Sequence, residues 1–146
     1  MKNRKGFSLL ELLIALGIIT IVSGGVFLAF RQTPRRALNN ASIQLQADLR
    51  YAQRRAIQEG RRIGIIFEPA HNRYRIMSTS PTEEIRVVYF QGGVRLRQTI
   101  PGARLDFLPR GTASSGFTIS LSNGRYWQRL TATVSGGRIE IFDITY

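Results

Sequence analysis

The sequence predicts an α+β protein, in which a long N-terminal helix packs its second half on an antiparallel β-sheet domain. Residues 12–30 form a stretch of 19 residues without a charge. A helical repeat of apolar residues follows it. From Arg61 onward, short runs of β-branched and aromatic residues alternate with turn residues. The predicted parts are a leader at 1–6, an apolar helix at 7–30, an amphipathic helix at 31–60 and a β-rich domain at 61–146.

The first 30 residues have the pattern of a membrane anchor. As a helix with a rise of about 1.5 Å per residue, residues 12–30 would be about 28 Å long, close to the thickness of a bilayer core. The basic residues Lys2, Arg4 and Lys5 precede this run, which predicts a cytoplasmic N-terminus and an extracytoplasmic C-terminal domain. A secretory signal peptide is the alternative, but the charge of Glu11 is out of place in its apolar core.

Glu11 needs a cationic partner if it enters a membrane. A carboxylate at mid-bilayer costs about 2.5–3.5 kcal/mol. Cleavage between Gly6 and Phe7 would create a new α-amine four residues before Glu11. That amine could neutralise Glu11 within one subunit or in a neighbouring subunit of a helical bundle.

The second helix is predicted over residues 37–59. Pro34, among several arginines, predicts a break or kink before it, and Gly60 predicts its end. Arg50, Arg54 and Arg55 fall on its polar side. The apolar stripe comprises Leu38, Ala41, Leu45, Leu49, Ala52 and Ala56.

The remainder of the chain predicts short strands joined by turns. A two-residue turn at Gly136-Gly137 would place Ala132 opposite Ile141 in the last hairpin, and Val134 opposite Ile139. The predicted strands span residues 63–67, 74–77, 85–90, 105–108, 117–121, 126–134 and 138–142.

Residues 5–11, Lys5-Gly6-Phe7-Ser8-Leu9-Leu10-Glu11, resemble the class III signal sequence of type IV pilins and type II secretion pseudopilins. The resemblance implies that a prepilin peptidase cuts after Gly6 and methylates Phe7. It also implies that Glu11 pairs with the N-terminal amine of a neighbouring subunit during filament assembly. Many major pilins carry a proline in the apolar stretch. This chain has only glycines there, which favours a minor subunit.

The later part of the chain resembles the GspH/FimT branch of minor pseudopilins. The resemblance rests on residues 49–57 (Leu-Arg-Tyr-Ala-Gln-Arg-Arg-Ala-Ile), residues 107–112 (Phe-Leu-Pro-Arg-Gly-Thr) and residues 136–141 (Gly-Gly-Arg-Ile-Glu-Ile). It implies a structural subunit of a type IV pilus or a type II secretion filament. The implied partners are prepilin peptidase, other pilin or pseudopilin subunits and the cytoplasmic membrane.

DNA binding for natural transformation is an alternative function. The net charge is +12, and every basic residue after the leader is an arginine, a side chain that binds phosphate with two hydrogen bonds. Strand alternation places Arg125, Trp127 and Arg129 on one face, which Arg138 joins through the turn. FimT-like members bind DNA through a Gly-Arg-x-Arg stretch, but here Glu140 occupies its last position. Packing of the aromatic residues under another strand is the competing interpretation.

The composition predicts neither an enzyme nor a metal or cofactor site. The chain has no cysteine, and His71, its single histidine, falls in a turn-like run. Three classes of function are therefore left: a structural minor pilin, a DNA-capturing subunit of the same machinery, and an unrelated membrane protein with a single span.

Overall fold

The computed structural model describes residues 9–29, 33–97, 101–132 and 139–145, with side chains at 9–21, 33–97 and 102–131. The chain divides into two units, Met1–Gln32 and Thr33–Tyr146. Helix α1 (Leu9–Ala29) belongs to the first unit. Within the described ranges, no helix has both the length and the apolar character needed to cross a membrane.

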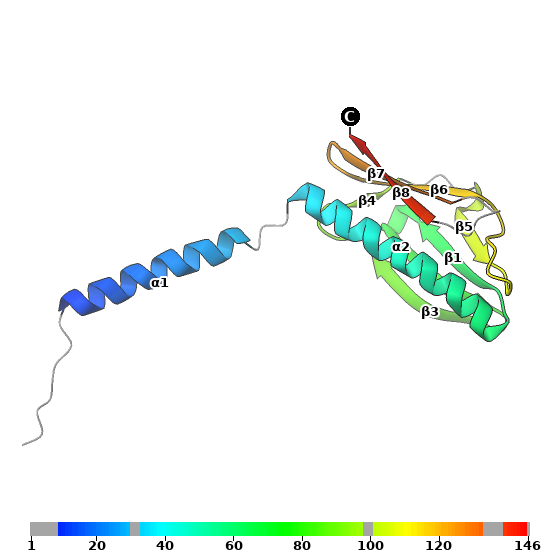
Figure 1. Ribbon diagram of the computed structural model, residues 1–146, viewed down its shortest axis with the longest axis horizontal. Helices are drawn as coiled ribbons and strands as arrows, with labels where there is room; N and C mark the ends of the chain where they lie inside the picture. Colours follow the sequence, from blue (N-terminus) through cyan, green and yellow to red (C-terminus); the bar gives the residue numbers. More distant parts are fainter. Residues whose placement is uncertain (1–8, 30–32, 98–100, 133–138, 146) are drawn as a thin grey trace, which may run out of the picture. The chain divides into compact units, whose positions relative to one another are not determined.

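The second unit contains helix α2 (Pro34–Glu59) and two four-stranded antiparallel sheets (Figure 1). Sheet A has the strand order β3-β2-β1-β5, and sheet B has the order β4-β6-β7-β8. Helix α2 contacts β1 and β5 of sheet A and β6, β7 and β8 of sheet B. The strands are β1 (Ile63–Glu68), β2 (Arg73–Thr79), β3 (Thr82–Tyr89), β4 (Arg95–Leu96), β5 (Arg104–Phe107), β6 (Phe117–Asn123), β7 (Tyr126–Ala132) and β8 (Ile139–Thr145), with short 3-10 turns η1 (Pro69–His71) and η2 (Pro101–Ala103). The predicted α+β class is confirmed.

Both ends of α2 follow from local chemistry. Thr33 has extended backbone angles, and Pro34 occupies the first helical turn, where a missing N–H is tolerated. Gly60 adopts the left-handed conformation, with φ of 61°, and its N–H donates to the carbonyl of Ile57. The predicted stop at Gly60 is confirmed, and the helix starts three residues earlier than predicted.

The apolar stripe of α2 lies in the core between the sheets. Leu45, Leu49, Ala52 and Ala56 are fully buried, and Ala41 is partly buried against them. Every described residue of the hydrophobic core lies between Ala37 and Leu130. The described core of the second unit therefore includes no residue of the first unit, and we expect residues 33–146 to fold as an independent fragment.

Each predicted strand is present with bounds that differ by at most three residues, and two larger differences concern β4 and the last hairpin. The two-residue strand β4 has no signal in the sequence, because so short a run shows no alternation. The predicted register of the last hairpin is wrong: Ala132 pairs with Ile139, not with Ile141, and Leu130 takes Ile141. A shift of two residues keeps every side chain on its face, so the alternation of apolar residues does not distinguish the two registers. Residues 133–138, with the predicted turn and Val134, lie outside the described residues.

Candidate functional site

The predicted processing and assembly residues lie at the start of the first unit. Gly6 and Phe7 fall outside the described residues, whereas Glu11 is exposed in the first turn of α1. A carboxylate is favoured there, because the N-terminal end of a helix carries partial positive charge. The described residues of α1 include no basic side chain, so a cation that pairs with the Glu11 carboxylate must come from outside these residues.

The described apolar side chains of α1, within residues 9–21, are exposed. Its nine largest described apolar residues are each more than half exposed, from Leu16 at 53% to Leu9 at 80%. An apolar surface of this extent is typical of a segment that a membrane or a partner covers. The exposed residues are Leu9, Leu10, Leu12, Leu13, Ile14, Leu16, Ile18, Ile19 and Ile21.

The predicted DNA-binding residues lie on or beside β7. Gln128 and Leu130 are buried toward α2, whereas Arg129 is exposed and Trp127 is half-buried, as alternation predicts. Trp127 is not among the described residues of the core or those packed against it. Arg125 lies in the turn before β7, with its guanidinium 5.6 Å from the ring centre of Tyr126.

The hairpin partners of this face come from β8. The register places Phe142 opposite Arg129 and the acidic Glu140 opposite Thr131. Arg138 lies outside the described residues. The structure therefore brings Trp127 and Arg129 to one face beside Arg125, and leaves the fourth predicted residue untested.

The buried carboxylate of Asp48, which the sequence analysis did not predict, connects α2 to sheet A by hydrogen bonds. Asp48 is 4% exposed and accepts hydrogen bonds from the hydroxyl of Tyr74 at 2.6 Å and from the guanidinium of Arg86 at 2.7 Å. Burial, with Asp48 next to it, raises the pKa of Tyr74 well above its ordinary value. The sequence feature that could have indicated this burial is the position of Asp48 next to Leu49, at the edge of the apolar stripe.

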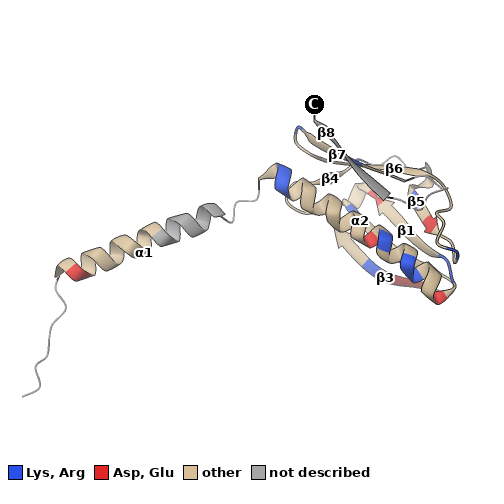
Figure 2. Ribbon diagram, in the orientation of Figure 1, with Lys and Arg blue, Asp and Glu red and all other residues tan. Residues whose placement is uncertain are grey.

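The polar side of α2 carries arginines in two environments. Arg50 and Arg54 are exposed, as expected for the predicted polar side. Arg55 donates to Glu59 at 2.6 Å and to the hydroxyl of Tyr51 at 2.8 Å. Figure 2 shows basic residues near both ends of the helix.

Sheet B is fastened to the start of α2 by amide side chains. The Asn123 amide donates to the carbonyls of Pro34 at 3.0 Å and Gly92 at 2.9 Å. Ser42 donates to the side-chain oxygen of Gln128, and both residues are buried. The Asn123 contacts hold the end of β6 and the loop before β4 against the first turn of α2, and the Ser42 contact holds β7 against the helix further along.

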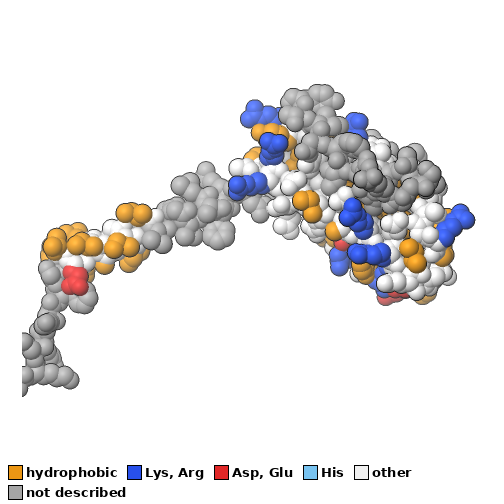
Figure 3. All heavy atoms as spheres, viewed as in Figure 1, with side chains coloured by type: hydrophobic (Ala, Val, Ile, Leu, Met, Phe, Trp, Pro, Cys, Tyr) orange, Lys and Arg blue, Asp and Glu red, His pale blue; other side chains and the backbone are white. Residues whose placement is uncertain are grey.

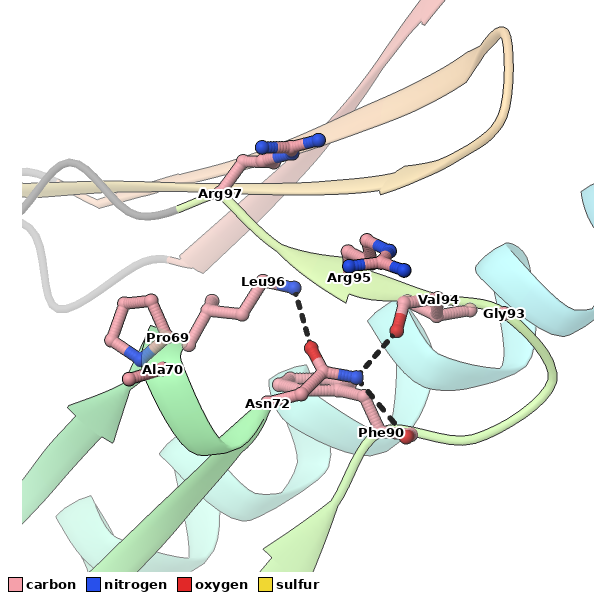
Figure 4. Close-up of a pocket in the computed structure, with 9 residues that line it drawn as sticks. All are labelled: Pro69, Ala70, Asn72, Phe90, Gly93, Val94, Arg95, Leu96 and Arg97. Carbon is pink, nitrogen blue, oxygen red and sulfur yellow. Dashed lines mark hydrogen bonds between the residues drawn. The ribbon is translucent and has the colours of Figure 1, made fainter.

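A hollow of about 580 Å³ lies between η1 and β4 (Figure 4). Its centre is Asn72, whose amide donates to the carbonyls of Phe90 and Val94 and whose oxygen accepts the N–H of Leu96. Asn72 therefore joins the two sheets. The lining residues are Pro69, Ala70, Asn72, Phe90, Gly93, Val94, Arg95, Leu96 and Arg97, none of which is a carboxylate, histidine or nucleophile. The described residues contain no cluster of His, Cys, Asp and Glu that could hold a metal ion.

Comparison with known proteins gives matches to family models and to solved structures. Residues 41–137 match the model of the type II transport protein GspH, and residues 1–27 match the prokaryotic N-terminal methylation motif. Two solved structures of the minor pseudopilin EpsH, from the type 2 secretion system of Vibrio cholerae, each superpose with a TM-score of 0.61. They share 16% and 13% sequence identity with this chain, cover 73% and 75% of it, and are themselves covered to 96% and 98%. No protein of curated function matches the sequence.

Proposed function

The chain belongs to the family of the type II transport protein GspH, and from this premise we propose that it is a minor pseudopilin incorporated into a secretion filament after processing by prepilin peptidase. Proteins of this family are structural filament subunits, and this chain is not an enzyme. Family membership also removes the alternative of an unrelated membrane protein. The proposal is carried by one observation: the methylation motif at 1–27 and the GspH match at 41–137 follow each other in one chain.

In this proposal the two units have different roles: the second unit forms the folded domain, and α1 makes the membrane and filament contacts. The second unit buries its own core, so it needs no help from α1 to fold. The exposed apolar side chains of α1 are then free to contact lipid before assembly and the corresponding helices of neighbouring subunits afterwards. The charge-free run at 12–30 supports an anchor in the cytoplasmic membrane with the second unit on the extracytoplasmic side.

Mass spectrometry of the mature N-terminus tests the processing step. We expect the purified protein to begin at Phe7 and to carry one methyl group on its α-amine. Gly6→Arg should leave the leader attached, because the residue before the cut would change from a glycine to a much larger, charged side chain. Lys5→Ala, which keeps the junction intact, is the matched control and should still be cut. A wild-type protein that begins anywhere except Phe7 would refute the prepilin proposal.

DNA capture is a second candidate function. It is favoured by one observation, that Trp127 lies outside the described core while Arg125 and Arg129 beside it are exposed. Arginines neutralise phosphates and an accessible aromatic ring stacks on a base, which is the pattern of non-specific nucleic-acid binding. Salt-dependent DNA binding would place this protein in an uptake filament.

A salt titration with duplex DNA and the fragment 33–146 tests this candidate. If DNA binds, Arg125→Ala/Arg129→Ala should reduce the slope of log affinity against log salt by about two, one for each lost phosphate contact. Arg50→Ala/Arg54→Ala removes the same charge from the exposed side of α2 and should change the slope less. The absence of binding at low salt, where attraction is strongest, would exclude DNA capture.

A further inference from the structure

Four of the arginines that the structure describes lie at the end of the second unit where α2 begins. Arg35 and Arg36 are in the first turn of α2, and Arg125 is in the β6–β7 turn that Asn123 fastens to Pro34. Arg95 pairs with Ser122, the neighbour of Asn123, on the adjacent strand. All four arginines are exposed, and Figure 3 shows basic side chains gathered at this end. We call Arg35, Arg36, Arg95 and Arg125 the α2-start arginine cluster.

A polar hollow of about 460 Å³ lies beside this cluster. Its lining contains two guanidinium groups, which can donate hydrogen bonds to an anion, and three side-chain amides, of which the Gln128 amide donates to Asn39. The side chain of Thr33 does not cap the helix, so the first backbone N–H groups of α2 are left without that partner. The lining residues are Thr33, Arg35, Arg36, Asn39, Asn40 and Gln128.

Acidic residues are scarce around the cluster. The described segments that carry the four arginines, residues 33–47, 90–97 and 117–132, contain no aspartate or glutamate. Asp48, the next acid along α2, is engaged by Tyr74 and Arg86. On β8, Asp143 occupies the register position opposite Gln128. These described segments therefore carry a positive charge, and their electrostatic potential favours an anionic partner.

We propose that the α2-start arginine cluster binds the headgroups of anionic phospholipids on the membrane surface from which residues 12–30 emerge. This inference rests on the proposed membrane anchor. Arg35 is only the fifth residue after Phe30, the last residue of the apolar run, so the chain itself delivers the cluster to the headgroup region. Guanidinium groups bind phosphate through paired hydrogen bonds, and an arginine near an anionic leaflet strengthens membrane binding about five-fold.

Co-sedimentation with vesicles tests the inference. The probe is a vesicle of phosphatidylglycerol and phosphatidylcholine, with pure phosphatidylcholine for comparison, and the protein is the fragment 33–146. We expect binding to the anionic vesicles only. Arg35→Ala/Arg36→Ala should weaken it about twenty-five-fold, the product of two five-fold effects.

The matched control removes two arginines from the same helix. Arg50→Ala/Arg54→Ala changes the net charge equally, but Arg50 lies about 22 Å along the helix from Arg35, well beyond the screening length of about 8 Å. The control should weaken binding less than three-fold. Far-ultraviolet circular dichroism and thermal unfolding establish that both variants keep the fold.

Three outcomes would overturn the proposal: no difference between the two kinds of vesicle, an equal loss in the control variant, or release by inorganic phosphate at millimolar concentration, which would indicate a site for the free anion. Duplex DNA that competes with the vesicles through Arg35 and Arg36 would instead assign the cluster to nucleic acid. Failure of the anchor itself has a separate signature, a full-length protein absent from the membrane fraction. If the full-length protein is found in the membrane but the fragment does not bind anionic vesicles, only the lipid inference is refuted.

Discussion

Single buried polar residues fix α2 to the two sheets at defined points. Asp48 accepts hydrogen bonds from β2 and β3 of sheet A, while Ser42 and Asn123 connect the helix to sheet B. A buried polar group is costly unless it is paired, so each of these residues penalises any sliding of the helix along the sheets. Apolar packing of α2 supplies stability, and these contacts make one position of the helix the favoured one.

Removal of the Asp48 carboxylate should lower the free energy of unfolding substantially. Asp48→Ala leaves the Tyr74 hydroxyl buried without an acceptor and deprives Arg86 of its counter-ion, so we expect the free energy of unfolding to fall by about 3 kcal/mol. Tyr74→Phe leaves the pair of Asp48 and Arg86 in place and should cost about 1 kcal/mol. Urea unfolding of the fragment 33–146 measures both. Equal, small losses would show that the carboxylate does not fasten the helix.

The acid dependence of stability should depend on Glu68. Its hydrogen bond from Arg73, with the charges of Arg73 and Arg75, lowers the pKa of the Glu68 carboxyl below its ordinary value of 4.5. A carboxyl with a lowered folded-state pKa stabilises the fold above its unfolded pKa, and the stabilisation is lost as the pH falls through the folded pKa. The wild-type fragment should therefore lose stability below about pH 4.5.

Glu68→Gln should lower stability at neutral pH and flatten this decline, because a glutamine does not titrate. Urea unfolding at about pH 6 and about pH 3 measures the difference. Glu83→Gln is the control, since the described residues place Glu83 in no ion pair. An unchanged pH dependence in the Glu68 variant would mean that its ion pairs add nothing to the folded state.

Helix α2 is the element that joins the domain core to the assembly segment. Its buried stripe contacts both sheets, so this one helix packs against sheet A and sheet B. Its opposite side keeps arginines and Ile43 exposed. The helix is thereby fixed to its own domain on one side and available to neighbouring subunits on the other.

A cavity on the buried side of α2 should cost far more than a truncation on the exposed side. Leu49 is fully buried, so Leu49→Ala should lower the free energy of unfolding by about 3 kcal/mol through lost burial and the cavity left behind. Ile43 is 52% exposed, and Ile43→Ala should cost less than about 1 kcal/mol. Chemical denaturation of the two variants compares them. Similar losses would contradict the assignment of the stripe to the core.

At the scale of the whole molecule, the proposed function assigns filament assembly to the first unit, whereas the described core lies in the second unit. The second unit contains the described core and the GspH match from residue 41 onward, while the methylation motif covers nearly all of α1. A change near the N-terminus should therefore affect processing or incorporation without destabilising the second unit.

Glu11→Val is the sharpest test of this separation. We expect the variant to be cut after Gly6 and inserted, because valine only improves the apolar character of the segment, yet to be poorly incorporated into filaments. Leu10→Val, one residue away, keeps the charge and should assemble normally. Shearing of filaments from cells, followed by immunoblotting of the sheared and membrane fractions, measures incorporation. Normal incorporation of the Glu11 variant would remove the pairing role.

The sequence by itself determined the elements whose patterns are local. The 3.6-residue repeat from Leu38 to Ala56 located α2 and its buried face, Gly60 marked its end, and the residues around Gly6 identified the class of filament subunit. These features depend on neighbours within a few positions, so the chain carries them before it folds.

Only the tertiary structure decided what depends on distant residues. The β7–β8 register is known only from the structure, because alternation tolerates a two-residue shift. The partners of Asp48 lie 26 and 38 residues away. Arg125 joins Arg35 at one end of the unit because the Asn123 side chain reaches the carbonyl of Pro34, 89 residues earlier. No local repeat encodes contacts of this kind, since they exist only after the sheets have closed around the helix.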